Sequence, residues 1–109
     1  MAQQLKGTLT VTKTDLIGVF KSEDGETTYT YAAKDFPHPP VVVDKIDAVL
    51  DVVEPNLLHG LMPFHGLIGP AAIVINMDGQ EIVFQAQLME PIEPPVPVAG
   101  VGIWSQSSS

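Results

Sequence analysis

Two Asp-Gly dipeptides, each next to runs of β-forming residues, constrain the fold of this chain more than any other feature. Asp24-Gly25 precedes an alternating run of threonine and tyrosine, and Asp78-Gly79 separates two runs that are rich in isoleucine and valine. Asp-Gly is favoured in tight turns between antiparallel strands, because the central residues of those turns need a positive φ. The two dipeptides therefore predict two β-hairpins.

Period-two alternation predicts further strands along the chain. In the first of them, Leu9 and Val11 share one face while threonines occupy the other, which is typical of a half-buried strand. The same reasoning gives roughly six strands, at residues 7–13, 16–21, 27–33, 71–77, 80–89 and 98–104. The proline-rich stretches 35–40 and 90–97 are expected to be connections, because proline cannot donate a hydrogen bond inside a sheet.

One segment changes period. Apolar residues at i, i+3, i+4 and i+7 begin at Ile46, acidic residues take the other side, and Asp44 is a good N-cap. This pattern predicts a short amphipathic helix near residues 44–54. The β-branched content of the segment favours a rival interpretation, a strand through residues 41–53.

These elements indicate a mainly β fold with mostly antiparallel pairing, either a β-sandwich or a small barrel, with one short helix near 44–54. An α+β fold is the alternative. The length predicts a single globular domain over residues 1–104, and the serine-rich residues 105–109 are expected to form a disordered polar tail.

The charge balance excludes several classes of function. Thirteen acidic residues stand against five lysines, there is no arginine, and the formal net charge is −8. Nucleic-acid affinity depends mostly on cationic contacts to phosphate, so no nucleic-acid partner is expected. A membrane partner is not expected either, because no apolar stretch of about 20 residues is free of glycine and proline. We expect a cytoplasmic protein.

Catalysis also finds little support in the sequence. The chain has no cysteine, no Gly-x-Ser-x-Gly motif and no phosphate-binding loop. Its serines lie in a predicted turn or in the predicted tail, where nothing would hold a catalytic triad in place. We therefore expect no enzyme activity and no cofactor.

The histidines are weak candidates for a metal site. His59 and His65 belong to a repeated His-Gly-Leu tripeptide, and His38 could supply a third ligand from the proline-rich loop. The spacing of six residues fixes neither a helical pair nor a pair on a regular strand, because glycine and proline interrupt the segment. Polar anchors that bond to free backbone groups are the better explanation, so we predict no metal.

An apolar run over residues 55–75, broken by glycine and proline and free of charge, is the best candidate for a binding surface. It is too broken for one helix and must be covered by a core, by a partner or, as the weakest alternative, by a lipid surface. The candidate interface residues are its large apolar side chains: Leu57, Leu58, Leu61, Met62, Phe64, Leu67 and Ile68. The sequence thus predicts a non-catalytic binding or assembly protein that self-associates, or binds another protein, through residues 57–68.

The alternative function is a small-molecule or carbohydrate-binding β module. Exposed aromatic rings on a sheet can stack on the face of a sugar or a heterocycle. Tyr29, Tyr31 and Trp104 are the candidate ligand-binding residues, with Phe64 completing the pocket.

Overall fold

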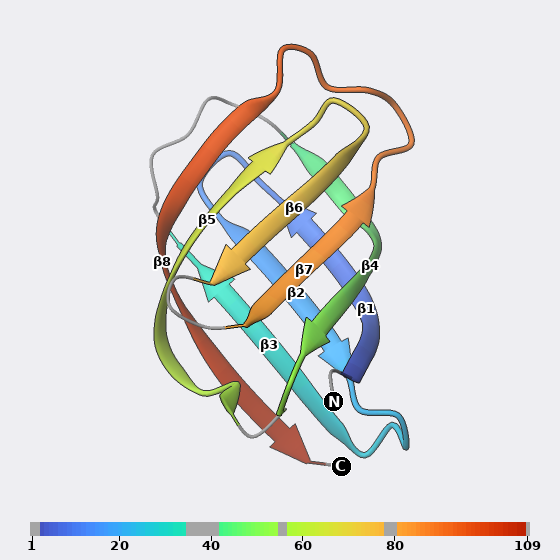
Figure 1. The fold of residues 1–109 in the computed structure, drawn as a ribbon, viewed down its shortest axis with the longest axis vertical. Coiled ribbons are helices and arrows are strands. Elements are labelled where there is room, and N and C mark those ends of the chain that lie inside the picture. The colour runs from blue at the N-terminus through green and yellow to red at the C-terminus, as the bar shows by residue number, and fades with distance from the viewer. Residues whose placement is uncertain (1–2, 35–41, 55–56, 78–80, 109) are drawn as a thin grey trace.

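The computed structural model describes residues 3–34, 42–54, 57–77 and 81–108, which form a closed antiparallel barrel (Figure 1). Its strands are β1 (Gln3–Val11), β2 (Leu16–Lys21), β3 (Thr27–Ala33), β4 (Val43–Val52), β5 (Gly60–Ile68), β6 (Ala72–Met77), β7 (Ile82–Gln87) and β8 (Val96–Ser108). Around the barrel the order is β1-β2-β3-β8-β5-β6-β7-β4. The mainly β, antiparallel prediction is confirmed, and the barrel replaces the sandwich.

Both predicted hairpins form. Gly25 has a φ of 76° in the turn between β2 and β3, and its N–H donates to the Ser22 carbonyl oxygen. The dipeptide Asp78-Gly79 lies outside the described residues, but the strands on either side of it pair antiparallel, with Asn76 opposite Val83. The antiparallel strand pairing that each dipeptide predicts is therefore confirmed.

The helix predicted near residues 44–54 is wrong, because β4 occupies most of that segment. Ala48, Leu50 and Val52 are buried, which is the period of a strand. β4 pairs with β1 along one edge and with β7 along the other, and this two-sided pairing supplies the hydrogen bonds that a short helix would have made internally. Tertiary pairing thus overrides the local helical pattern.

The apolar run that the sequence analysis treated as broken contains a regular strand, β5. Pro63 pairs with Val101 of β8, but it lies just before the described pairing of β5 with β6, which begins at Phe64. Its missing N–H is therefore tolerated at the end of that ladder. Proline is accommodated where a strand lacks a neighbour to which it would have to donate. Residues 105–108, expected in a polar tail, belong to β8 and pair with β3.

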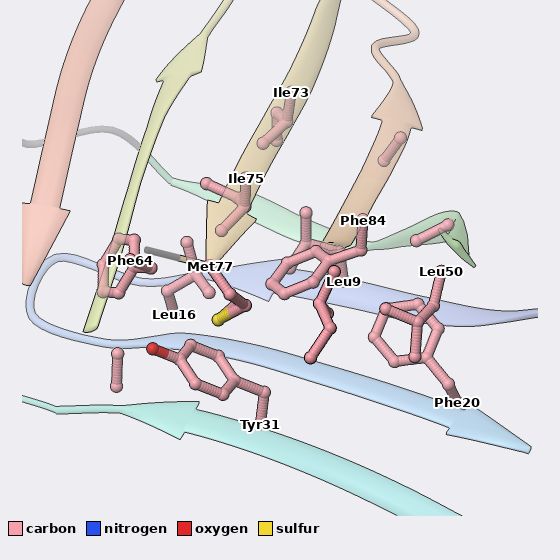
Figure 2. Close-up of a cluster of buried hydrophobic side chains, with 14 of the residues drawn as sticks. Leu9, Leu16, Phe20, Tyr31, Leu50, Phe64, Ile73, Ile75, Met77 and Phe84 are labelled. Atoms are coloured by element: carbon pink, nitrogen blue, oxygen red, sulfur yellow. The ribbon is translucent and has the colours of Figure 1, made fainter. Parts of the chain in front are cut away.

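The core fills the barrel interior with large side chains from every strand. Figure 2 shows Leu9, Phe20, Tyr31, Phe64 and Phe84 pointing into the interior from five different strands. Aromatic rings contact one another closely, and the Tyr31 and Trp104 ring centroids are 5.0 Å apart. Among the described residues the core contains no buried charged side chain. A closed, apolar core of this kind leaves the outer surface of the barrel as the place to look for function.

Candidate functional site

The outer surface of β5 and β8 carries the clearest concentration of exposed apolar side chains. The two strands run side by side along one edge of the barrel (Figure 1). Leu61 pairs with Ile103 across the strands, and Pro63 pairs with Val101. The exposed fraction is 73% for Leu61, 53% for Val101 and 52% for Ile103. We call this surface the β5–β8 face; its outward residues are Leu61, Pro63, His65, Leu67, Pro97, Ala99, Val101 and Ile103.

Strand alternation explains why these residues point outward. Met62, Phe64 and Ile68 of β5 are buried in the core, so the residues between them face solvent. On β8, Val98 and Trp104 are buried in the same way. The outward set is therefore fixed by the core, and a shift of one residue would place the aromatic side chains outside.

The β5–β8 face is also uncharged. Neither β5 nor β8 contains an aspartate, glutamate, lysine or arginine, and the same is true of the neighbouring strands β3 and β6. Charged residues are exposed across the barrel, on β4, which presents Asp44, Lys45 and Asp47. Among the described strands, the uncharged ones, β3, β8, β5 and β6, are thus neighbours on one side of the barrel.

The structure divides the predicted interface residues into two groups. Leu57, Leu61 and Leu67 are exposed, whereas Leu58, Met62, Phe64 and Ile68 belong to the core. The sequence analysis did not identify Val101 and Ile103, which are exposed on β8 beside Leu61. No alternation of apolar and polar residues marks them, because the buried positions of this segment, Val98, Gly102 and Trp104, are themselves apolar or glycine.

A hollow lies at one end of this face, where β5 meets β6 and the beginning of β8. Its volume is about 770 Å³, and its lining is almost entirely apolar. We call it the β5–β6 hollow; its side walls include Leu67, Val74 and Pro97, with His65 and Asn76 supplying polar groups. None of the residues that line it carries a formal charge.

A second hollow, of about 760 Å³, lies beside the first half of β4. Its lining is more polar and includes Asp44, Asp47, Gln85 and Gln87. Among the described residues, no group of three or more histidine, cysteine, aspartate or glutamate side chains comes together in a way that could hold a metal ion.

The three predicted ligand-binding aromatics lie inside the barrel. Tyr29, Tyr31 and Trp104 are all buried. The Tyr31 hydroxyl donates to the carbonyl oxygen of Met62 at 2.7 Å, and the Trp104 indole N–H has no hydrogen-bond partner among the described residues. The Tyr31 and Trp104 rings pack against each other, and all three side chains are too buried to offer a face on which a sugar could stack.

The two described histidines, His59 and His65, lie in different settings. His59 precedes β5 and is exposed, whereas His65 lies on the outer surface of that strand. His38 lies outside the described residues. The repeated His-Gly-Leu tripeptide consequently falls in two different settings, a connection and a regular strand.

The best-defined electrostatic feature is a turn rather than a site. The Asp24 carboxylate accepts hydrogen bonds from the Ser22 hydroxyl and from the Glu26 N–H, and these bonds lower the pKa of Asp24 below its ordinary value. The Ser22 hydroxyl is the larger cause. Because Asp24 lies in the fully exposed β2–β3 turn, we assign these bonds to turn geometry.

Comparison with known proteins gives no relative: no protein-family model, no curated protein and no solved structure matches this chain. The described part of the chain also contains no helix that is long and apolar enough to cross a membrane. Function is therefore inferred from the chemistry of the barrel surface.

Proposed function

We propose that this protein is a non-catalytic assembly protein that self-associates through the β5–β8 face. The observation that carries the proposal is the row of exposed apolar side chains Leu61, Val101 and Ile103 on two paired strands without a charge between them. Contiguous apolar patches that charged residues do not interrupt are typical of interaction sites.

Burial of apolar side chains supplies the free energy for this association. Fully burying one leucine, isoleucine or valine side chain contributes about 1.5–3 kcal/mol. Association costs at least about 4 kcal/mol in lost translational and rotational freedom. Several exposed apolar residues on one rigid surface can offset that cost together, whereas a single residue cannot. A strand pair in a closed barrel provides such a surface, because its side chains are already held in place.

The charge distribution supports association between identical chains. Each copy carries a formal net charge of −8, so two copies repel each other at most approaches. The β5–β8 face is the side of the described surface where no acidic strand residue opposes contact. Self-association through this face therefore minimises like-charge repulsion while it buries apolar area.

A second candidate function is the binding of a small apolar molecule in the β5–β6 hollow. The hollow of about 770 Å³ falls within the range of roughly 300–1,000 Å³ that is common for ligand pockets. Carbohydrate binding has less support, because the aromatic rings that it would use are buried.

The test is the molar mass in solution, measured by light scattering across a wide concentration range. We expect a species at a multiple of 11.7 kDa. The double variant Val101→Thr/Ile103→Thr keeps β-branched side chains but removes apolar surface, so it should weaken association at least about tenfold.

Val42→Thr is the matched control, because Val42 is at least as exposed, at 61%, but lies outside the β5–β8 face. It should leave the molar mass unchanged. The proposal would be contradicted if the chain stays monomeric at every concentration. It would also be contradicted if Val42→Thr weakens association as much as the double variant does.

A further inference from the structure

The two ends of the β5–β8 face have opposite shapes. At one end Leu61 and Ile103 pair across the strands and project from the surface, with exposed fractions of 73% and 52%. At the other end the β5–β6 hollow recedes beside Leu67 and Pro97, which also pair across the two strands. A projection and a hollow thus lie on one continuous apolar face.

On β5, Leu61 marks the projection and Leu67 marks the hollow. Leu61 and Leu67 are six residues apart on the same strand, which corresponds to about 20 Å and places both side chains on the outer surface. Phe64 is the midpoint of this interval. A two-fold axis that lies in the plane between two facing copies, perpendicular to β5 and level with Phe64, would place each end of the strand against the opposite end of its partner.

We propose that two copies of this chain pair face to face with their β5 strands antiparallel, so that each inserts Leu61 and Ile103 into the β5–β6 hollow of the other. The inference rests on the proposed function and specifies its partner and geometry. A closed dimer requires one patch to be complementary to itself, and a projection and a hollow on the same patch satisfy this requirement.

The chemistry of the hollow fits this occupant. Leu67, Val74 and Pro97 line it with apolar groups, and no lining residue carries a formal charge. A volume of about 770 Å³ is comparable with pockets that hold whole small ligands, so there is room for Leu61 together with Ile103. The parallel arrangement would place projection against projection and hollow against hollow, which would leave the hollows unfilled.

A charge-swap experiment tests the register. Leu61→Lys places an ammonium group on the projection, and Leu67→Glu places a carboxylate in the hollow; both positions are exposed in the single chain. A homodimer of either variant would bury one unpaired charge at each of its two contacts. Each variant alone should therefore be monomeric at concentrations where the original chain is dimeric. Mixed in equal amounts, they form one original contact and one Lys–Glu contact.

We therefore expect the mixture to form a heterodimer that associates at least about tenfold more tightly than either variant alone. Native mass spectrometry distinguishes the heterodimer from both homodimers by mass. The control is a mixture of Leu61→Glu with Leu67→Glu, which retains the original contact but opposes two carboxylates, and it should stay monomeric. Val74→Glu provides a second hollow variant if Leu67→Glu does not fold.

The outcomes separate the two proposals. If the original chain dimerises but the Lys–Glu mixture does not, or if Leu61→Lys alone still dimerises, the antiparallel arrangement is overturned while self-association stands. If the original chain is monomeric at all concentrations, both proposals fail.

Discussion

The ring of Tyr31 lies directly over Gly102, so closely that a Cβ atom on residue 102 would be 2.4 Å from the ring carbon Cζ. From this position the Tyr31 hydroxyl reaches beyond β8 and donates to the Met62 carbonyl oxygen on β5. A side chain of β3 thus crosses β8 and bonds to β5, the other strand of the β5–β8 face. The absence of a side chain at Gly102 makes this arrangement possible.

Gly102→Ala should therefore destabilise the barrel by about 1–3 kcal/mol, the usual cost of overpacking a tight core. The free energy of unfolding from urea denaturation measures the effect. A double-mutant cycle with Tyr31→Leu identifies the cause, because a shorter side chain relieves the contact with the new Cβ. An equal cost of Gly102→Ala in both backgrounds would contradict the contact and would point to the backbone of β8 instead.

Tyr31→Phe should lower the free energy of unfolding by about 1 kcal/mol, because it removes one buried hydrogen bond and leaves the ring in place. For a domain of this size the midpoint of thermal unfolding should fall by about 4–8 °C. Tyr29→Phe is the matched control: Tyr29 is also buried, and no hydrogen bond from its hydroxyl to another described residue is seen. A loss as large for Tyr29→Phe would show that the Met62 carbonyl bond is not the cause.

The sequence predicted the local features of the fold better than it predicted how the strands close into a barrel. Alternation around Leu9 and the turn at Gly25 depend on neighbouring residues, and both predictions are confirmed. Segment 44–54 could not be settled locally, because its apolar residues satisfy a helical spacing while Leu50 and Val52 also satisfy the period of a strand. The choice is made by pairing with β1 and β7, which are distant in sequence.

For the same reason the sequence singles out only one of the two strands that form the β5–β8 face. The run around Leu61 stands out as uncharged and apolar in the sequence. Val101 and Ile103 alternate with glycine and the buried Trp104, so their outward direction depends on knowing which residues face the core. Only the register of β5 against β8 places Ile103 beside Leu61.

The single tryptophan provides a direct test of the packed interior. Trp104 is 2% exposed and its indole N–H has no partner among the described residues, so its fluorescence should be blue-shifted and acrylamide should quench it far less than in the urea-unfolded chain. Added sugars should leave the emission unchanged, because the rings offer them no face. Emission at the wavelength of solvated indole, or a saturable change with a sugar, would contradict this structure of the core.

The β2–β3 turn gives a pH-dependent prediction. Hydrogen bonds from the Ser22 hydroxyl and the Glu26 N–H lower the pKa of Asp24 below its ordinary value of 3.8. Because the folded pKa is the lower one, the stabilisation from the ionised carboxylate is fully present above pH 3.8 and is lost as the pH falls through the folded value. Ser22→Ala removes the larger cause, so it should move the pKa of Asp24 back toward its ordinary value.

A carboxyl-carbon NMR titration of the original chain and of Ser22→Ala measures this shift directly. Ser105→Ala is the control, because Ser105 lies on β8 opposite Thr30, away from the turn, and it should leave the titration of Asp24 unchanged. Since the carboxylate is fully exposed, high salt should change the shift little if short hydrogen bonds cause it, whereas a long-range charge effect would be screened. An Asp24 titration that is identical in the original chain and in Ser22→Ala would remove the hydroxyl as the cause.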